Sequence, residues 1–92
     1  MTTASVIIAT YNRATLLDDC LRHLARNDFV PGDEVIVCDN GSTDTTATVV
    51  AAHATGYPVP LRYVLESTPG KSHAVASGLA LAGGDIVAFT DD

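Results

Sequence analysis

Ser5-Val-Ile-Ile-Ala-Thr10 is an uninterrupted run rich in β-branched residues, without alternation between apolar and polar side chains. This pattern is typical of a strand that is covered on both faces, as in a parallel sheet. Glu34–Asp39 is a second such run, and Leu61–Glu66 and Asp85–Thr90 are further predicted strands. Because the Ser5–Thr10 strand has no face suited to solvent, we expect it in the interior of the sheet.

Three helices are predicted between these strands. Asn12 is the expected N-cap of the first helix and Ser42 that of the second, whose apolar stripe is predicted at Ala47, Val50, Ala51 and Ala54. The third helix follows Gly70-Lys71, with a predicted sheet-facing stripe at Val75, Gly78, Leu79 and Ala82. Strands and helices in alternation, with short connections, predict an α/β fold: a parallel, doubly wound sheet with helices on both faces.

Composition excludes several classes of protein. The 92 residues carry 11 acidic and 5 basic side chains, a net charge of −6, which argues against a nucleic-acid partner. With 47% hydrophobic and 17% charged residues, the chain is expected to fold as a single domain over residues 1–92. The longest uncharged apolar run, Val6–Ala9, is too short to span a membrane, and no basic segment precedes it, so we expect a cytoplasmic protein. Cys20 and Cys38 are expected to be reduced thiols.

Polar residues follow the predicted strands at their carboxyl ends, where parallel sheets bind ligands. Tyr11 can stack on a flat base and Arg13 can approach a phosphate, although a tyrosine at a sheet rim is also ordinary packing. Asp39 can accept hydrogen bonds from a base or from ribose hydroxyls. Its alternative role is to cap the following turn by accepting the backbone N–H of Ser42 or Thr43.

Three further charged residues suggest phosphate and metal chemistry. Adjacent carboxylates repel each other, so Asp91 and Asp92 are most useful where they share a Mg²⁺ or Mn²⁺ ion with phosphate oxygens. The alternative is two solvated acids at a chain end. Lys71 can neutralise a phosphate, or it is simply an exposed lysine.

Familiar nucleotide and hydrolase motifs are missing. No G-x-G-x-x-G follows the first strand, no G-x-x-x-x-G-K-[ST] loop is present, and no serine lies in a G-x-S-x-G setting. A glycine loop therefore does not cradle phosphates, and serine hydrolysis has no support. The three histidines are dispersed and receive no catalytic role.

Four ordered blocks of sequence resemble the family 2 glycosyltransferases of GT-A fold. The blocks are Val6-Ile-Ile-Ala-Thr-Tyr-Asn-Arg13, Val35-Ile-Val-Cys-Asp-Asn-Gly-Ser-Thr-Asp44, Gly70-Lys71 with the following helix, and Ile86-Val-Ala-Phe-Thr-Asp91-Asp92. The resemblance implies a Rossmann-like GT-A half domain with strand order 3-2-1-4. It further implies that Thr10, Tyr11 and Asp39 hold the base and ribose of a nucleotide sugar, most often UDP-linked. Lys71 would lie near base or diphosphate, and Asp91 would be the first acid of a metal-binding D-x-D.

The chain departs from the family pattern in several residues and in the part of the enzyme that it covers. Ala9 replaces the usual proline, Asn40 replaces the usual second aspartate, and Val75-Ala76 stands where Leu-Asn or Arg-Asn is common. The family's acceptor site and catalytic base also come from a later half. We therefore expect the donor-binding part of an inverting glycosyltransferase, truncated at its D-x-D and inactive alone. The acceptor hydroxyl, on a glycan, a lipid or a small molecule, is not identified.

A second interpretation is a non-catalytic α/β module that binds nucleotide or Mg²⁺. In a response-regulator-like version, Asp39, Asp91 and Asp92 would form the magnesium pocket. That version would leave Tyr11-Asn12-Arg13 idle and would need a fifth strand. In either case an exposed edge and an uncovered sheet face favour self-association.

Overall fold

The computed structural model describes residues 2–91 and, within them, a four-stranded parallel sheet. The strands are β1 (Ala4–Thr10), β2 (Glu34–Asp39), β3 (Leu61–Leu65) and β4 (Ile86–Asp91), and the helices are α1 (Ala14–Leu24), α2 (Thr46–Ala54) and α3 (Lys71–Leu81). The sheet order is β3-β2-β1-β4, and every neighbouring pair is parallel. The expected strand order and the interior place of β1 are both confirmed.

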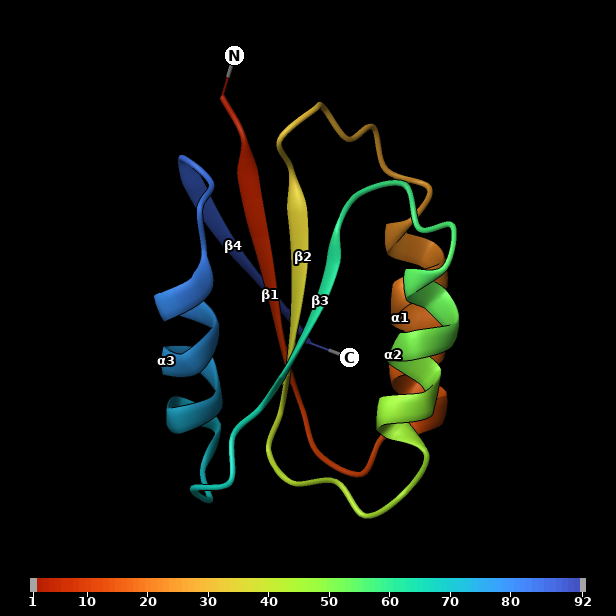
Figure 1. Cartoon of the computed structure of the whole chain (residues 1–92), viewed down its shortest axis with the longest axis vertical. Coiled ribbons are helices and arrows are strands. Elements are labelled where there is room, and N and C mark those ends of the chain that lie inside the picture. Colours follow the sequence, from red (N-terminus) through yellow and green to blue (C-terminus); the bar gives the residue numbers. More distant parts are fainter. Residues whose placement is uncertain (1, 92) are drawn as a thin grey trace.

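Helices cover the two faces of the sheet unequally. Helices α1 and α2 lie side by side on one face, and α3 lies on the other (Figure 1). Side chains of β1 and β2 point alternately to the two layers: Ile8 packs in the core below α1 and α2, whereas Ile7 packs in the core below α3. Both sides of these strands are buried, which explains why their sequences show no polar alternation.

Small residues let α3 approach the sheet. A Cβ atom on Gly78 would lie 2.6 Å from the Cys38 Sγ and 2.9 Å from an Ile7 methyl group. Ala74 and Gly78 are the buried residues of α3, whereas Leu79 is 45% exposed. The predicted stripe is therefore correct at Gly78 and wrong at Leu79, because the close approach leaves room only for small side chains. Cys38 is a free thiol whose burial raises its pKa to about 11.

The predicted apolar stripe of α2 is correct at Val50 and wrong at its alanines. The buried residues of the helix are Thr46 and Val50, and Ala47 and Ala51 of the predicted stripe are exposed. Thr46 tolerates burial because its hydroxyl and its N–H both donate to the Asp44 carboxylate. A polar residue held in this way shifts the buried face, and hydrophobicity alone did not reveal it.

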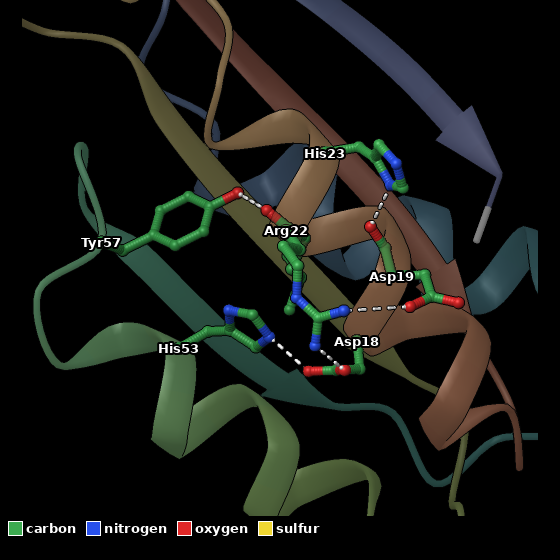
Figure 2. Close-up of polar contacts among 7 residues, drawn as sticks. Asp18, Asp19, Arg22, His23, His53 and Tyr57 are labelled. Atoms are coloured by element: carbon green, nitrogen blue, oxygen red, sulfur yellow. Dashed lines mark hydrogen bonds and ion pairs between the residues drawn. The ribbon is translucent and has the colours of Figure 1, made fainter.

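Polar side chains join α1 to α2 at the surface (Figure 2). The His53 Nε2 lies 2.6 Å from the Asp18 Oδ1, and Arg22 also contacts the Asp18 carboxylate. The Tyr57 hydroxyl donates to the Leu21 carbonyl at 2.8 Å. The hydrogen bond from His53, supported by Arg22, lowers the pKa of Asp18. These contacts lie on the outer layer and fix the helix pair.

Strand β4 is one edge of the sheet and is thinly covered. Ile86 and Phe89 on this strand are 54% and 57% exposed. Association through this surface stays a prediction. No helix among residues 2–91 is long and apolar enough to cross a membrane.

Candidate nucleotide site

A cavity of about 260 Å³ opens at the carboxyl end of β1. Its lining consists of Ala9, Thr10, Tyr11, Arg13, Asn40, Lys71 and Ala74. Four of the predicted ligand residues, Thr10, Tyr11, Arg13 and Lys71, are thus brought together although the last is 58 positions or more from the others. The structure places them where parallel α/β sheets bind ligands.

The residues that line this cavity differ in burial and come from different elements. Thr10 is buried at the end of β1, whereas Tyr11 is 55% exposed. Arg13 is the N-cap residue of α1, and Lys71 is the first residue of α3. A cavity lined by an exposed aromatic ring and by two cationic side chains suits a flat base joined to an anionic group.

Asp39 is buried and does not line this cavity. Its side chain is 1% exposed, and its Oδ1 accepts hydrogen bonds from the Ser42 N–H at 2.9 Å and the Ser42 hydroxyl at 2.6 Å. Its Oδ2 accepts the Tyr63 hydroxyl at 2.6 Å. Burial, together with the Asp39 carboxylate, raises the pKa of Tyr63 to about 12, so the phenol stays protonated and donates. The contact with the Ser42 N–H is the one expected of a turn cap, and a ligand role for Asp39 stays a prediction.

The loops after β1 and β2 are tied directly to each other. The Asn12 N–H donates to the Ser42 hydroxyl at 2.8 Å, and the Thr43 N–H donates to the Asn12 Oδ1 at 2.7 Å. Asn12 adopts a left-handed φ of 49°, a conformation that asparagine tolerates better than most residues. The Ala14 N–H donates to the Asp44 carboxylate at 3.1 Å.

Both predicted helix N-caps are wrong. Arg13, not Asn12, is the N-cap of α1, and Thr45, not Ser42, is the N-cap of α2. Asn12 and Ser42 have the side chains of good caps, but both are engaged between loops. Local sequence could not reveal this, because the partner of each lies 30 or 31 positions away.

Asn40 also lines the cavity, although the sequence analysis treated it only as a departure from the family pattern and gave it no role in the site. Its Nδ2 donates to the Glu66 carbonyl at 3.0 Å and the Thr68 carbonyl at 2.8 Å, and its Oδ1 accepts the Gly70 N–H at 2.8 Å. A usable signal was present, since an amide in place of an acid adds two donors.

Gly70 is the N-cap of α3, the helix whose first residue is Lys71. Its φ of 121° and ψ of 133° lie in a region that is essentially restricted to glycine. A Cβ atom there would meet only the His73 ring, at 3.4 Å, so glycine is required by backbone conformation and not by space. The chain can therefore turn sharply from the loop into α3 beside the cavity.

A second cavity, of about 340 Å³, continues toward β4. It is lined by Ile7, Ala9, Lys71, Val75, Phe89 and Thr90, so Ala9 and Lys71 border both cavities. The backbone of Asp91 ends β4 in register with Ala9. The predicted metal ligand Asp92 lies outside the described residues. Among the side chains that the structure describes, which exclude that of Asp91, no group of three or more His, Cys, Asp or Glu is placed to hold a metal, so the metal site stays a prediction.

Residues 5–92 match the family model described as glycosyl transferase family 2. The chain belongs to this family. The validoxylamine A glucosyltransferase of Streptomyces hygroscopicus subsp. limoneus is 43% identical over 90 residues, which are 95% of this chain and 19% of that protein. The AglE glycosyltransferase of Haloferax volcanii is 34% identical over 89 residues, which are 95% of this chain and 29% of that protein. The chain thus spans less than a third of these relatives.

Solved glycosyltransferase structures share the fold. A mannosyltransferase from Pyrobaculum calidifontis, in complex with GDP-Man and Mn²⁺, matches with a TM-score of 0.88 and 37% identity over 96% of this chain and 26% of that one. Staphylococcus aureus TarS 1-349, in complex with UDP-GlcNAc, matches with a TM-score of 0.81 and 34% identity over 97% of this chain and 26% of that one. The resemblance to family 2 glycosyltransferases of GT-A fold is therefore confirmed. The family match disfavours the response-regulator-like interpretation.

Proposed function

We propose that residues 1–92 form the donor-binding part of a glycosyltransferase, with the cavity beside β1 holding the nucleoside diphosphate of a nucleotide sugar. The observation that carries this proposal is the cavity lining, which contains the exposed aromatic ring of Tyr11 together with the cations Arg13 and Lys71. The relatives' solved complexes, which contain GDP-Man or UDP-GlcNAc, support it. UDP is the first ligand to test, because the motifs resemble enzymes that most often use UDP-sugars.

Each side chain receives a role that its setting permits. Tyr11 stacks on the base, and Arg13 and Lys71 attract the diphosphate. Asp39 is assigned to the base or ribose through a single acceptor position, because a carboxylate has about four and the Ser42 N–H, the Ser42 hydroxyl and the Tyr63 hydroxyl use three of them. Thr10 closes the floor of the cavity at the end of β1.

A divalent cation completes the proposed donor site. Asp91 and Asp92 are the carboxylates assigned to Mg²⁺ or Mn²⁺, and hard oxygen ligands suit both ions. The backbone of Asp91 pairs with Ala9, which borders both cavities, so the end of β4 is next to the proposed diphosphate position. When bound, such an ion would neutralise charge on the departing diphosphate. Solved neighbours that contain Mn²⁺ support a divalent metal.

The proposed reaction is sugar transfer to an acceptor hydroxyl with inversion at the anomeric carbon. This reaction requires a base to remove the acceptor proton. We assign no residue of this chain to that base and expect no turnover from residues 1–92 alone. The acceptor class stays open between glycan, lipid and small molecule.

Calorimetric titration tests donor binding directly. UDP, GDP and uridine are titrated into the chain with Mn²⁺ present. We expect saturable UDP binding that Arg13→Gln weakens about tenfold, because a charge-assisted contact to phosphate is lost. Arg26→Gln is the matched control, since it removes the same charge from an exposed position after α1. If neither UDP nor GDP binds, the proposal is contradicted. Tight binding of Mn²⁺ alone that perturbs Asp39 would favour the metal-binding module instead.

A further inference from the structure

Asn40 commits its whole side chain to one loop. The loop, residues 66–70, connects β3 to α3, and the Asn40 amide bonds to its backbone at three points, Glu66, Thr68 and Gly70. Two of these are donated hydrogen bonds and one is accepted, which uses both amide hydrogens and the amide oxygen. The backbone of Asn40 is itself fixed, because its N–H donates to the Thr10 carbonyl at 2.9 Å.

The same loop determines where Lys71 lies. Gly70 receives the last of the three bonds, and Lys71 follows it directly as the first residue of α3. A second fastening comes from Glu66, whose carboxylate accepts the Thr68 N–H at 3.0 Å and the Ser77 hydroxyl at 2.6 Å. Lys71 borders both cavities, so a shift of the loop would move a positive charge relative to each.

An aspartate could not replace Asn40 in this arrangement. A carboxylate donates no hydrogen bond at neutral pH, so both carbonyl contacts would be lost. Its oxygen would also face the Glu66 and Thr68 carbonyl oxygens at about hydrogen-bond distance, where like partial charges repel. Only the contact with the Gly70 N–H would survive.

We propose that Asn40 is a positioning residue for diphosphate recognition, and that it acts by holding the 66–70 loop so that Lys71 faces the cavity. This inference rests on the proposed donor site. The inference predicts different effects on the nucleoside and on the diphosphate of the ligand. The base is assigned to Tyr11 and Asp39, and neither residue belongs to the 66–70 loop. Loss of the Asn40 amide should therefore affect diphosphate binding more than nucleoside binding.

A double-mutant cycle tests the coupling between Asn40 and Lys71. UDP and uridine affinities are measured for the parent, Asn40→Ala, Lys71→Gln and the double variant. We expect Asn40→Ala to weaken UDP binding about tenfold and uridine binding less than about twofold, and to add little in the Lys71→Gln background. Asn40→Asp should weaken UDP binding further, because its new charge repels the diphosphate. Asn27→Asp makes the same chemical change at an exposed position after α1 and serves as the control.

Hydrogen exchange supplies a readout that needs no ligand. Asn40→Ala should speed exchange of the His73 and Ala74 amides, which bond to the Gly70 carbonyl, while the Val49 amide of α2 stays unchanged. If Asn40→Ala fails to fold, Ser77→Ala releases the second fastening of the loop and should change the same quantities in the same direction.

Three results would overturn the inference: equal loss of UDP and uridine affinity in Asn40→Ala, a loss that persists at full size in the Lys71→Gln background, or unchanged exchange in the first turn of α3. If the parent binds neither UDP nor uridine, the proposed function fails and the inference fails with it. If the parent binds UDP and Asn40→Ala retains full affinity, only the inference fails.

Discussion

The amino and carboxyl ends of the sheet are held by the same kind of contact, but they leave different amounts of space. At the amino end, Glu34 accepts the Ser5 hydroxyl at 2.7 Å and the Gly83 N–H at 2.8 Å, and the Ser5 hydroxyl accepts the Gly84 N–H at 2.8 Å. Asp33 accepts the Ala4 N–H at 2.7 Å. The backbone at Gly84 lies directly against the backbone of Ala4 and Ser5 at this end.

At the carboxyl end, side chains again bond to the backbone of distant loops, but the loops surround a cavity. Asn12 and Ser42 join the loops after β1 and β2, and Asn40 holds the loop before α3. The difference is that Tyr11, in the loop after β1, and Lys71, directly after the 66–70 loop, are exposed and line the cavity. We infer that the contacts at the amino end act mainly on stability, whereas those at the carboxyl end also orient groups toward a ligand.

The largest expected effect on stability is at Gly84. A Cβ atom there would lie 2.7 Å from the Ser5 backbone nitrogen and 2.8 Å from the Ala4 carbonyl carbon, and strand backbone cannot move aside cheaply. We expect Gly84→Ala to lower the free energy of unfolding by about 3 kcal/mol. Urea denaturation measures the loss. Gly83→Ala is the neighbouring control, because its Cβ would meet only the Glu34 carboxylate, at 3.7 Å. Equal effects of the two substitutions would contradict the tight amino end.

Asp39, at the carboxyl end, is expected to affect both stability and ligand binding. Asp39→Ala leaves the Tyr63 hydroxyl and the Ser42 groups without their buried acceptor, which should cost about 2 kcal/mol of unfolding free energy. It should also weaken UDP binding about tenfold, by loss of a ligand acceptor. Denaturation and calorimetry together measure both effects. Tyr63→Phe, which removes one of these contacts and keeps the carboxylate, is the control. Full UDP affinity with reduced stability would show that Asp39 is a turn cap only.

Glu34 should make the amino end sensitive to pH. The Gly83 N–H, followed by the Ser5 hydroxyl and Arg62, lowers the pKa of Glu34 against an opposing effect of burial. The charged form is thus favoured by folding, and its contribution is present above the ordinary glutamate pKa of about 4.3 and lost as the pH falls through the folded-state pKa. Glu34→Gln should lose about 1 kcal/mol at pH 7. Denaturation at pH 7 and pH 3 should show that its deficit relative to the parent shrinks at the lower pH. A deficit that is the same at both would contradict this.

Tyr11 should show the smallest effect on stability. Its ring is 55% exposed, so Tyr11→Ser should change the unfolding free energy by less than about 0.5 kcal/mol. Uridine affinity should fall about tenfold because base stacking is lost. Tyr11→Phe keeps the ring and should retain that affinity in the same titration. Unchanged uridine binding by Tyr11→Ser would mean that the ring does not hold the base.

The sheet could be predicted because its signal is local. The apolar run from Val6 to Ile8 has no polar alternation, and the buried strand it predicts is the one found, with Ile7 and Ile8 packed into opposite layers. The same reasoning failed at Asn12 and Ser42. Both look like helix caps, but they bond to each other's loops across 30 residues, and only the parallel arrangement of β1 and β2 brings those loops together.

The candidate site could be predicted in its lining residues but not in the contacts that hold Asp39 and Asn40. Tyr11, Arg13 and Lys71 meet because the carboxyl ends of parallel strands share one edge of the sheet. The hydrogen bond from Tyr63 to the buried Asp39 was not predictable, because β3 supplies a partner that no motif identifies. Asn40 was treated as a departure from a pattern, and its three contacts depend on the path of the 66–70 loop.

The most direct test of the division between the two ends is a map of backbone amide chemical shifts during titration with UDP and Mg²⁺. We expect saturable changes at Tyr11, Asn40 and Lys71, around the carboxyl-end cavity, and none at Val35 and Gly84. Changes centred on the amino end, or on the α1–α2 surface around His53, would contradict the assignment of the ligand site to the carboxyl end.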